Sequence, residues 1–200
     1  MEAKDKFTLG LELPTDPRWV DIAGKNIEDI LVDHAYCEQK AASSSISLII
    51  NYPERDKLVE TLTPIVAEEW AHFERVVEAL RKRGFSLGRK RKDEYVDKLI
   101  EASRKGGSRE EQLMEKLLIN ALIEARSCER FKLLWKNIAD EELSRFYYEL
   151  MVSEAGHYKT FLLLAKEYMP EQAVMTRWHQ LLEQEAEIMR TLTPRPDRMH

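Results

Sequence analysis

Hydrophobic side chains recur along this chain at helical spacing, in long stretches whose other positions are strongly polar. Apolar residues make up 44% of the 200 positions and charged residues 34%, while glycine and proline occur only seven times each. This balance is typical of long amphipathic helices with solvated outer faces. We expect helices at about 16–23, 26–50, 53–83, 93–103, 109–139, 141–168 and 170–192, followed by a loose tail at 193–200.

Local start and stop signals set these limits. Asp16 precedes a proline, so its side chain can cap a helix that the proline opens. Asn51 to Pro53 break the first long pattern, Gly84 is suited to cap the end of the second, and Gly106 to Ser108 form a turn that caps the next helix. Pro64 falls inside the second long helix and should kink it.

The four long helices predict a bundle. The first two have a short connection, as do the last two, so each pair should be antiparallel. A connection of about 25 residues links the two pairs. We therefore expect an all-α four-helix bundle with a long crossover between helix pairs and extra short helices. It should be one domain over residues 1–200, with the bundle at about 26–168 and an extra C-terminal helix at about 170–192.

Two short words carry most of the chemical information, EWAH at 69–72 and EAGH at 154–157. Each places a carboxylate three residues before an imidazole within a predicted helix. A step of three residues returns to within about 60° of the same helix face and advances about 4.5 Å, so one metal ion can contact both side chains. A single such word is more often a solvated glutamate beside a surface or core histidine.

An internal repeat connects the two words. A shift of 86 positions superimposes Glu38 on Glu124, and Asn51 at the first hairpin turn on Asn137 at the second. With one deletion in the second half, the two words also align. A lone glutamate therefore precedes each word by a similar distance, and two antiparallel helices joined by a tight turn bring those positions to similar heights.

The repeat selects two carboxylates outside the words and gives each half of the chain the same donor set. The six candidate metal ligands are Glu38, Glu69, His72, Glu124, Glu154 and His157. Two glutamates and two Glu-x-x-His pairs on four helices form the carboxylate-bridged dinuclear site of ferritin-like bundles. Four carboxylates offset most of the charge of two divalent irons, and the set leaves open positions for O2. We expect two iron ions here, although the same ligands also suit manganese.

Residues beside these ligands have alternative interpretations. His34 lies one helical turn before Glu38, and Asn120 lies one turn before Glu124. Each could hydrogen-bond a ligand and fix its orientation, or could be an ordinary packed or surface polar residue. Glu129 lies about 140° around the helix from Glu124, and we interpret it as a solvated charge.

The cysteines and aromatic residues are expected to be structural. Cys37 and Cys128 lack zinc-type spacing, so small buried thiols are the favoured interpretation, and Cys128 could line the metal pocket. The remaining rings of interest are expected to pack in the core or between helices: Trp19, Trp70, Trp135, Trp178, and the residues that follow the two histidines, Phe73 and Tyr158.

Charge is unevenly distributed. The formal net charge is −5, yet the segment 81–105 holds ten basic and four acidic residues. Its densest part is Arg89-Lys90-Arg91-Lys92 in a predicted loop, which could contact the phosphates of a nucleic acid or be an ordinary solvated loop. No stretch approaches 18 consecutive apolar residues, and residues 1–13 lack an apolar signal core. We therefore expect a soluble, cytoplasmic protein without a membrane partner.

The flanks of the ligand words resemble a known family. DHAYCEQKAA at 33–42, EEWAHF at 68–73 and EARSCERF at 124–131, with the basic loop before Asp93, resemble the tRNA 2-methylthio-N(6)-isopentenyladenosine hydroxylases, which are nonheme diiron monooxygenases. The resemblance covers nearly the whole chain and shows no departure at the six ligand positions. It implies O2-dependent hydroxylation of the isopentenyl group of a modified adenosine beside the anticodon of tRNA. It also implies two external electrons from an electron-transfer reductase or ferredoxin.

Two other function classes fit parts of the pattern. A ferritin- or rubrerythrin-like protein would oxidise iron or reduce peroxide, although the chain has no four-cysteine rubredoxin module. A metal-free helical interaction module would bind no stoichiometric iron. Assembly size distinguishes a ferritin-like storage protein, which forms a very large shell, from a tRNA hydroxylase, which we expect to be a monomer or small oligomer.

Overall fold

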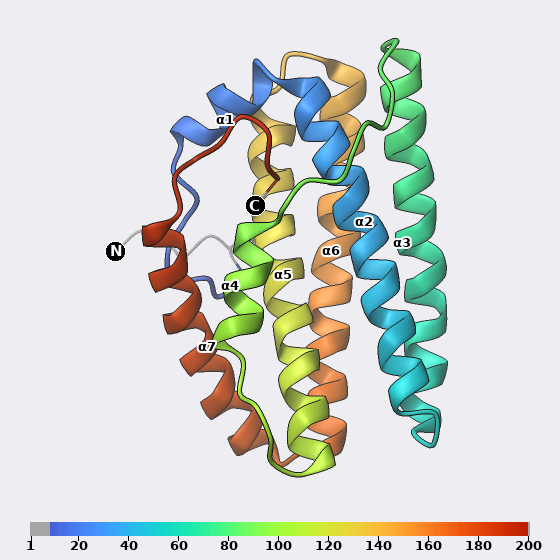
Figure 1. Ribbon diagram of the computed structural model, residues 1–200, viewed down its shortest axis with the longest axis vertical. Coiled ribbons are helices and arrows are strands. Elements are labelled where there is room, and N and C mark those ends of the chain that lie inside the picture. Colours follow the sequence, from blue (N-terminus) through green and yellow to red (C-terminus); the bar gives the residue numbers. More distant parts are fainter. Residues whose placement is uncertain (1–8, 200) are drawn as a thin grey trace. The chain divides into compact units, whose positions relative to one another are not determined.

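The chain is described by a computed structural model that covers residues 9–199 (Figure 1). Over these residues seven α-helices account for the regular secondary structure, and no strand occurs among them. The helices follow the predicted ranges to within about three residues at each end. The described chain divides into two compact units, one made of residues 9–20 and 93–194 and the other of residues 21–92 and 195–199. The short helix α1 (Arg18–Gly24) contains the point where the chain passes from the first unit to the second.

The unit of residues 21–92 is built on a helical hairpin. Helices α2 (Ile27–Asn51) and α3 (Asp56–Lys82) lie side by side and antiparallel, joined by the turn at residues 52–55 (Figure 1). Each buries apolar residues at three- and four-residue intervals, such as Leu58, Leu62 and Ile65 of α3. Pro64 lies within α3, which continues through it.

The unit of residues 93–194 repeats this hairpin and adds two helices. Helices α5 (Arg109–Asn137) and α6 (Glu141–Tyr168) form the second antiparallel pair (Figure 1). Helices α4 (Glu94–Ala102) and α7 (Glu171–Thr191) pack on each other and on α5. Because α5 is covered on several sides, most of its side chains from Leu113 to Leu134 are buried.

The helix ends follow the predicted capping chemistry. The carboxylate of Asp16 accepts the backbone N–H of Arg18 at 2.9 Å at the start of α1. Gly84 follows α3 with φ +78°, a left-handed conformation that glycine adopts without the penalty of a Cβ atom. Ser108 caps α5 in a reciprocal box with Glu111, in which each side chain accepts the other residue's backbone N–H.

The internal repeat is visible at the two hairpin turns. Asn51 ends α2 and Asn137 ends α5. The side-chain amide of each donates to the carbonyl four residues earlier, Ser47 at 2.7 Å and Leu133 at 2.8 Å. The predicted alignment of these two turns is therefore confirmed. The expectation of one domain over residues 1–200 stays a prediction.

The expected loose tail is wrong for the residues that the structure describes; His200 lies outside them, as do residues 1–8. Met199 is fully buried, and its backbone N–H donates to the carboxylate of Asp33 on α2 at 2.7 Å. The Arg198 guanidinium donates to the Lys92 carbonyl at 2.8 Å. These two anchors tie the end of the chain to α2 and to the basic loop, contacts that local composition does not encode. Among residues 9–199 no helix combines the length and apolar character that a membrane crossing requires.

Candidate metal centre

The α2–α3 hairpin brings three of the predicted ligands together. Glu38 projects from α2, and Glu69 and His72 project from α3. The Nδ1 atom of His72 lies 3.7 Å from an oxygen of Glu38 and 3.7 Å from an oxygen of Glu69. Each residue offers one ligand atom, and these atoms lie within 4.8 Å of one another. All three side chains are buried, with Glu69 only 1% exposed.

The α5–α6 hairpin gathers the equivalent three residues. Glu124 projects from α5, and Glu154 and His157 from α6. The Nδ1 atom of His157 lies 3.6 Å from an oxygen of Glu154, and ligand atoms from all three residues lie within 4.8 Å of one another. Glu154 is 2% exposed and Glu124 4%. Each hairpin thus presents two carboxylates and one imidazole, with the Nδ1 atom of the histidine 3.6–3.7 Å from the glutamate three residues before it.

The chemistry of these donors fits a divalent transition metal. Two buried carboxylates within 4.8 Å repel each other and lose their hydration, and a bound cation relieves both costs. Carboxylate oxygen with imidazole nitrogen is a set that iron and manganese accept, while thiolate is absent among the three residues of each hairpin. The residues present therefore fit one half of a dinuclear iron centre in each hairpin.

His34 contacts the predicted ligand on its own helix. Its Nε2 atom lies 2.6 Å from an oxygen of Glu38, and the ring is completely buried. A hydrogen bond of this kind fixes the orientation of the carboxylate. The repeat-equivalent Asn120 makes a different contact, since its amide donates to the Lys116 carbonyl at 2.8 Å. The two halves therefore differ one turn before their lone glutamates.

The two cysteines differ in exposure. Cys128 is fully buried beside the α5–α6 ligands, and its thiol donates to the Met151 carbonyl at 3.3 Å. Burial, with a contribution from the Glu154 carboxylate, raises the pKa of the Cys128 thiol to about 12. It is therefore a protonated, apolar lining group at neutral pH. Cys37 is only half-buried, so the expectation that both thiols are buried is wrong for that residue.

The interpretation of Glu129 as a solvated charge is wrong. Its carboxylate is buried and accepts the backbone N–H of Thr15 at 2.8 Å and the Thr15 hydroxyl at 2.5 Å. It also pairs with the guanidinium of Arg126, one turn earlier on α5. Sequence position showed that Glu129 turns away from Glu124, but not that a second buried face exists there. That face is created by the N-terminal segment and α7, which are distant in sequence.

Arg126 is the centre of this second polar cluster, which the sequence reasoning missed. Its guanidinium is completely buried and donates to Glu185 of α7 at 2.6 and 2.9 Å and to the Leu13 carbonyl at 2.9 Å. One turn on, the Arg130 guanidinium lies 4.3 Å from the ring centre of Trp19. The arginine–glutamate spacing of three residues was the available signal. This cluster fixes α5 just beyond Glu124.

The four basic residues of the loop at 89–92 differ in exposure. Arg89, Lys90 and Lys92 are exposed. Arg91 is half-buried and forms an ion pair with Asp29 on α2, and it also donates to the Asp197 carbonyl at 3.4 Å. The Asp29 hydrogen bond is the main cause that raises the pKa of Arg91. Arg91 therefore anchors the loop, while the other three side chains present charge to solvent.

The aromatic residues mostly pack as expected, with one exception. Trp19 and Trp178 are buried, and the Tyr158 ring lies 5.8 Å from that of Trp178. Trp70 is 46% exposed, so the expectation that it packs in the core or between helices is wrong. The centre of its ring lies 4.9 Å from that of Phe73.

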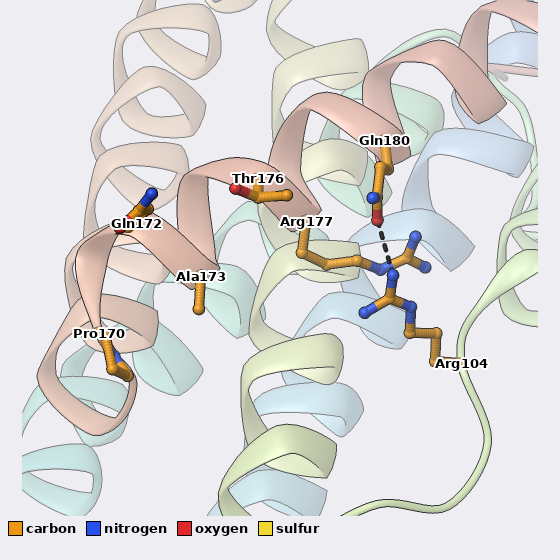
Figure 2. A pocket seen from close by; sticks show the side chains of 7 residues that line it. All are labelled: Arg104, Pro170, Gln172, Ala173, Thr176, Arg177 and Gln180. Carbon is orange, nitrogen blue, oxygen red and sulfur yellow. Dashed lines mark hydrogen bonds between the residues drawn. The ribbon is translucent and has the colours of Figure 1, made fainter.

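A surface groove of about 430 Å³ lies along α7 and is lined by Arg104, Pro170, Gln172, Ala173, Thr176, Arg177 and Gln180 (Figure 2). Figure 2 shows the Arg104 guanidinium bonded to Gln180, at 2.7 Å. The Arg177 guanidinium is held by both oxygens of Glu115, at 2.5 and 2.8 Å. Glu115 precedes Glu124 by nine residues on α5, or about 14 Å along the helix. The groove is therefore separate from the α5–α6 ligands.

Known proteins of one family are similar in sequence to this chain over most of its length. Its sequence matches the family described as tRNA-(MS[2]IO[6]A)-hydroxylase (MiaE) over residues 2–200. A tRNA 2-(methylsulfanyl)-N(6)-isopentenyladenosine(37) hydroxylase from Pseudomonas putida strain KT2440 is 38% identical over 161 residues, 80% of this chain and 77% of the relative. A protein of the same name from Salmonella typhimurium strain LT2 is 28% identical over 212 residues, with the same shares covered.

The fold is similar to that of a solved structure. A Synechococcus protein described as having aldehyde deformylating oxygenase activity matches with a TM-score of 0.89 and 33% sequence identity. The match covers 95% of this chain and 94% of that chain. The predicted all-α, ferritin-like fold is thereby confirmed.

Proposed function

Because the chain belongs to the tRNA-(MS[2]IO[6]A)-hydroxylase (MiaE) family, we propose that it hydroxylates the isopentenyl group of a hypermodified adenosine beside the anticodon of tRNA. The family match over residues 2–200 is the observation that carries this conclusion. The two curated relatives support it, because both are named as hydroxylases of 2-(methylsulfanyl)-N(6)-isopentenyladenosine(37) in tRNA. The chain is thus an enzyme of tRNA modification.

The two ligand sets together are proposed to bind one pair of iron ions. Each hairpin supplies two buried carboxylates and one imidazole, which is half of the donor set of a carboxylate-bridged dinuclear site. A shared centre is supported by the donor set of ferritin-like bundles, in which two lone glutamates and two Glu-x-x-His pairs from four helices hold one pair of metal ions. The full set is Glu38, Glu69, His72, Glu124, Glu154 and His157.

Bound ferrous iron would supply O2 activation, so that one oxygen atom enters a carbon–hydrogen bond while two external electrons and two protons reduce the other atom to water. The chain's own residues prepare this chemistry. Burial of the ligands excludes water and strengthens their attraction for cations. His34 holds the carboxylate of Glu38 in one orientation at 2.6 Å. Cys128 stays a protonated thiol and contributes an apolar wall rather than a ligand.

The partners follow from the reaction. The two electrons require a donor, for which we propose an electron-transfer reductase or a ferredoxin. The exposed side chains of Arg89, Lys90 and Lys92 are proposed to contact tRNA phosphates, while Arg91 keeps the loop in place through Asp29. A monomer or small oligomer in the cytoplasm suits a tRNA substrate.

The proposed function is tested with reduced, iron-loaded protein and tRNA that carries the isopentenylated adenosine. Nucleosides from the digested tRNA should gain the mass of one oxygen atom, only in the presence of O2. Glu69→Ala should lose both iron and activity while retaining its helices. Glu68→Ala is the matched control, because Glu68 is the exposed neighbour on the same turn of α3. Product formation by iron-free protein, or no product despite full iron occupancy and a competent reductant, would refute the proposal.

The structural neighbour supplies a second candidate activity. Its description names aldehyde deformylating oxygenase activity, and the folds superpose with a TM-score of 0.89. The same reduced protein can be incubated with a long-chain aldehyde in place of tRNA. Turnover of the aldehyde without turnover of tRNA would favour this second activity.

A further inference from the structure

Trp70 presents a large aromatic surface to solvent beside the candidate ligands. It is 46% exposed, and its ring lies 4.9 Å from that of Phe73, tilted by 37°. The indole N–H donates to the carboxylate of Glu74 at 3.2 Å, which holds the ring along the surface of α3. Tryptophan combines a large apolar ring with a polar N–H and is enriched at surfaces that contact other molecules.

The internal repeat shows that this surface is specific to one half of the chain. The equivalents of Trp70 and Phe73 are Ala155 and Tyr158. Tyr158 contacts α7, through the ring of Trp178 at 5.8 Å. Residues 21–92, all of which the structure describes, contain after α1 only the helices α2 and α3 and therefore no counterpart of α7. The second half replaces the indole with a methyl group and packs the following ring against Trp178, whereas the first half leaves the indole of Trp70 exposed, with the half-buried Phe73 ring beside it.

Position along α3 relates the two rings to the metal ligands. Trp70 follows Glu69 and Phe73 follows His72, so rings and ligands occupy the same turn. At about 100° per residue, Phe73 lies about 70° from the mean direction of the two ligands, and Trp70 lies about 60° farther in the same sense. The two rings therefore lie between the exposed side of α3 and its ligand face. A planar base stacked on them can direct a substituent toward the ligand face.

Positive charge continues from the rings toward the end of α3. Arg81 is eleven residues after Trp70, within about 20° of the same face and about 16 Å along the helix. It is exposed, and the basic loop with Arg89 and Lys90 follows. Single-stranded RNA is recognised by this combination, in which bases stack on aromatic side chains and basic groups contact the phosphates.

We propose that Trp70 and Phe73 form a stacking surface for a base of the tRNA anticodon loop, positioned so that the N6 substituent of the modified adenine enters the ligand face of α3. The inference rests on the proposed function and gives these two residues a substrate-positioning role. Glu74 serves to hold the indole in the stacking orientation.

The test compares tRNA binding and turnover by Trp70→Ala, Trp70→Phe and Trp70→Leu. Stacking on one aromatic side chain contributes about 1–3 kcal/mol per base, so Trp70→Ala should raise KM and Kd for tRNA about 5- to 150-fold. We expect kcat and iron content to stay within about twofold, because the variant keeps the ligands. Trp70→Phe should restore most of the affinity, whereas Trp70→Leu, which is apolar but has no π face, should not.

A matched control comes from α6. Tyr148 is 45% exposed, and its ring lies 4.9 Å from that of Trp135, so it belongs to a similar aromatic pair on the other hairpin. Tyr148→Ala should leave KM and Kd for tRNA unchanged. The salt dependence adds a second readout, because loss of stacking should lower affinity equally at all salt concentrations, whereas loss of a phosphate contact changes the slope.

The outcomes separate this inference from the proposed function. If the wild-type protein hydroxylates tRNA and Trp70→Ala keeps its KM and Kd, the stacking role is overturned and the function stands. Full affinity in Trp70→Leu would also overturn it, since the surface would then be merely apolar and suited to a protein partner. If the wild-type protein binds tRNA without hydroxylating it, the proposed function fails, and the Kd values of the three variants still decide the stacking role.

Discussion

Replacing Glu185 with leucine should destabilise the protein by about 3 kcal/mol, because the buried guanidinium of Arg126 loses one of its two carboxylate partners. Arg126 and Glu185 are both completely buried. The substitution removes two hydrogen bonds from Arg126 to the same carboxylate oxygen, at 2.6 and 2.9 Å, and one from the Tyr95 hydroxyl at 3.3 Å. Hydrogen bonds to charged groups contribute about 1.5–3 kcal/mol each, and breaking a buried pair costs about 3–5 kcal/mol.

Two observations select the lower end of that range. Arg126 keeps its ion pair with Glu129 on the same helix. Burial raises the pKa of the Glu185 carboxyl despite the neighbouring guanidinium, so desolvation already offsets part of the attraction in the native protein. For a chain of this size, about 3 kcal/mol corresponds to a fall in Tm of about 6–12 °C.

The assay is thermal unfolding followed by circular dichroism, with urea unfolding as a second measure. Glu187→Leu is the matched control, because Glu187 pairs with Arg190 on the same helix at 2.8 Å but both side chains are mostly exposed. That variant should change stability by less than about 1 kcal/mol. Equal effects of the two substitutions would refute the argument that burial determines the strength of this pair.

Three further outcomes are expected. Burial alone would raise the pKa of Glu115, but hydrogen bonds, chiefly from Arg177, outweigh it and lower the pKa below 4.5. The ionised Glu115 therefore stabilises the fold above pH 4.5, and this stabilisation is lost as the pH falls through the lowered pKa. The difference in Tm between wild type and Glu115→Gln should accordingly shrink below pH 4.5. Cys128 should resist alkylation in the native protein while the half-buried Cys37 reacts, so mass spectrometry should find one label before unfolding and two after. Truncation after Asp197 removes two anchors of the basic loop and α2, and should lower both Tm and tRNA affinity, whereas unchanged values would mean that these contacts carry no stability.

The helices, and which candidate ligands share a helix face, could be predicted from the chain because their determinants are local. The capping chemistry of Asp16 and Ser108 depends on residues two or three positions away. The spacing of Glu69 and His72 places them on one face of any helix that contains them. The repeat then identified Glu38 and Glu124 without knowledge of the packing, because equal separation from a tight turn gives equal height.

The second face of α5 could not be predicted in this way. Glu129 was expected to be solvated. Helix geometry gives the direction in which its side chain points relative to Glu124, but not which other segment packs there. The structure places Thr15 there, 114 positions away, and brings Glu185 of α7 to Arg126. Similarly, Met199 is buried, and its N–H donates to Asp33, 166 positions away.

The sequence by itself determined which side chains share a helix face, because helical geometry converts spacing into direction over a few residues. It therefore determined the helices, the two hairpins and the donor set of each candidate half-site. Tertiary structure alone decided which faces are covered, since burial depends on elements brought together from far along the chain. Tertiary packing thus leaves Trp70 exposed and brings Trp178 of α7 against Tyr158. It also pairs Arg91 of the basic loop with Asp29, while the other basic side chains of the loop stay exposed.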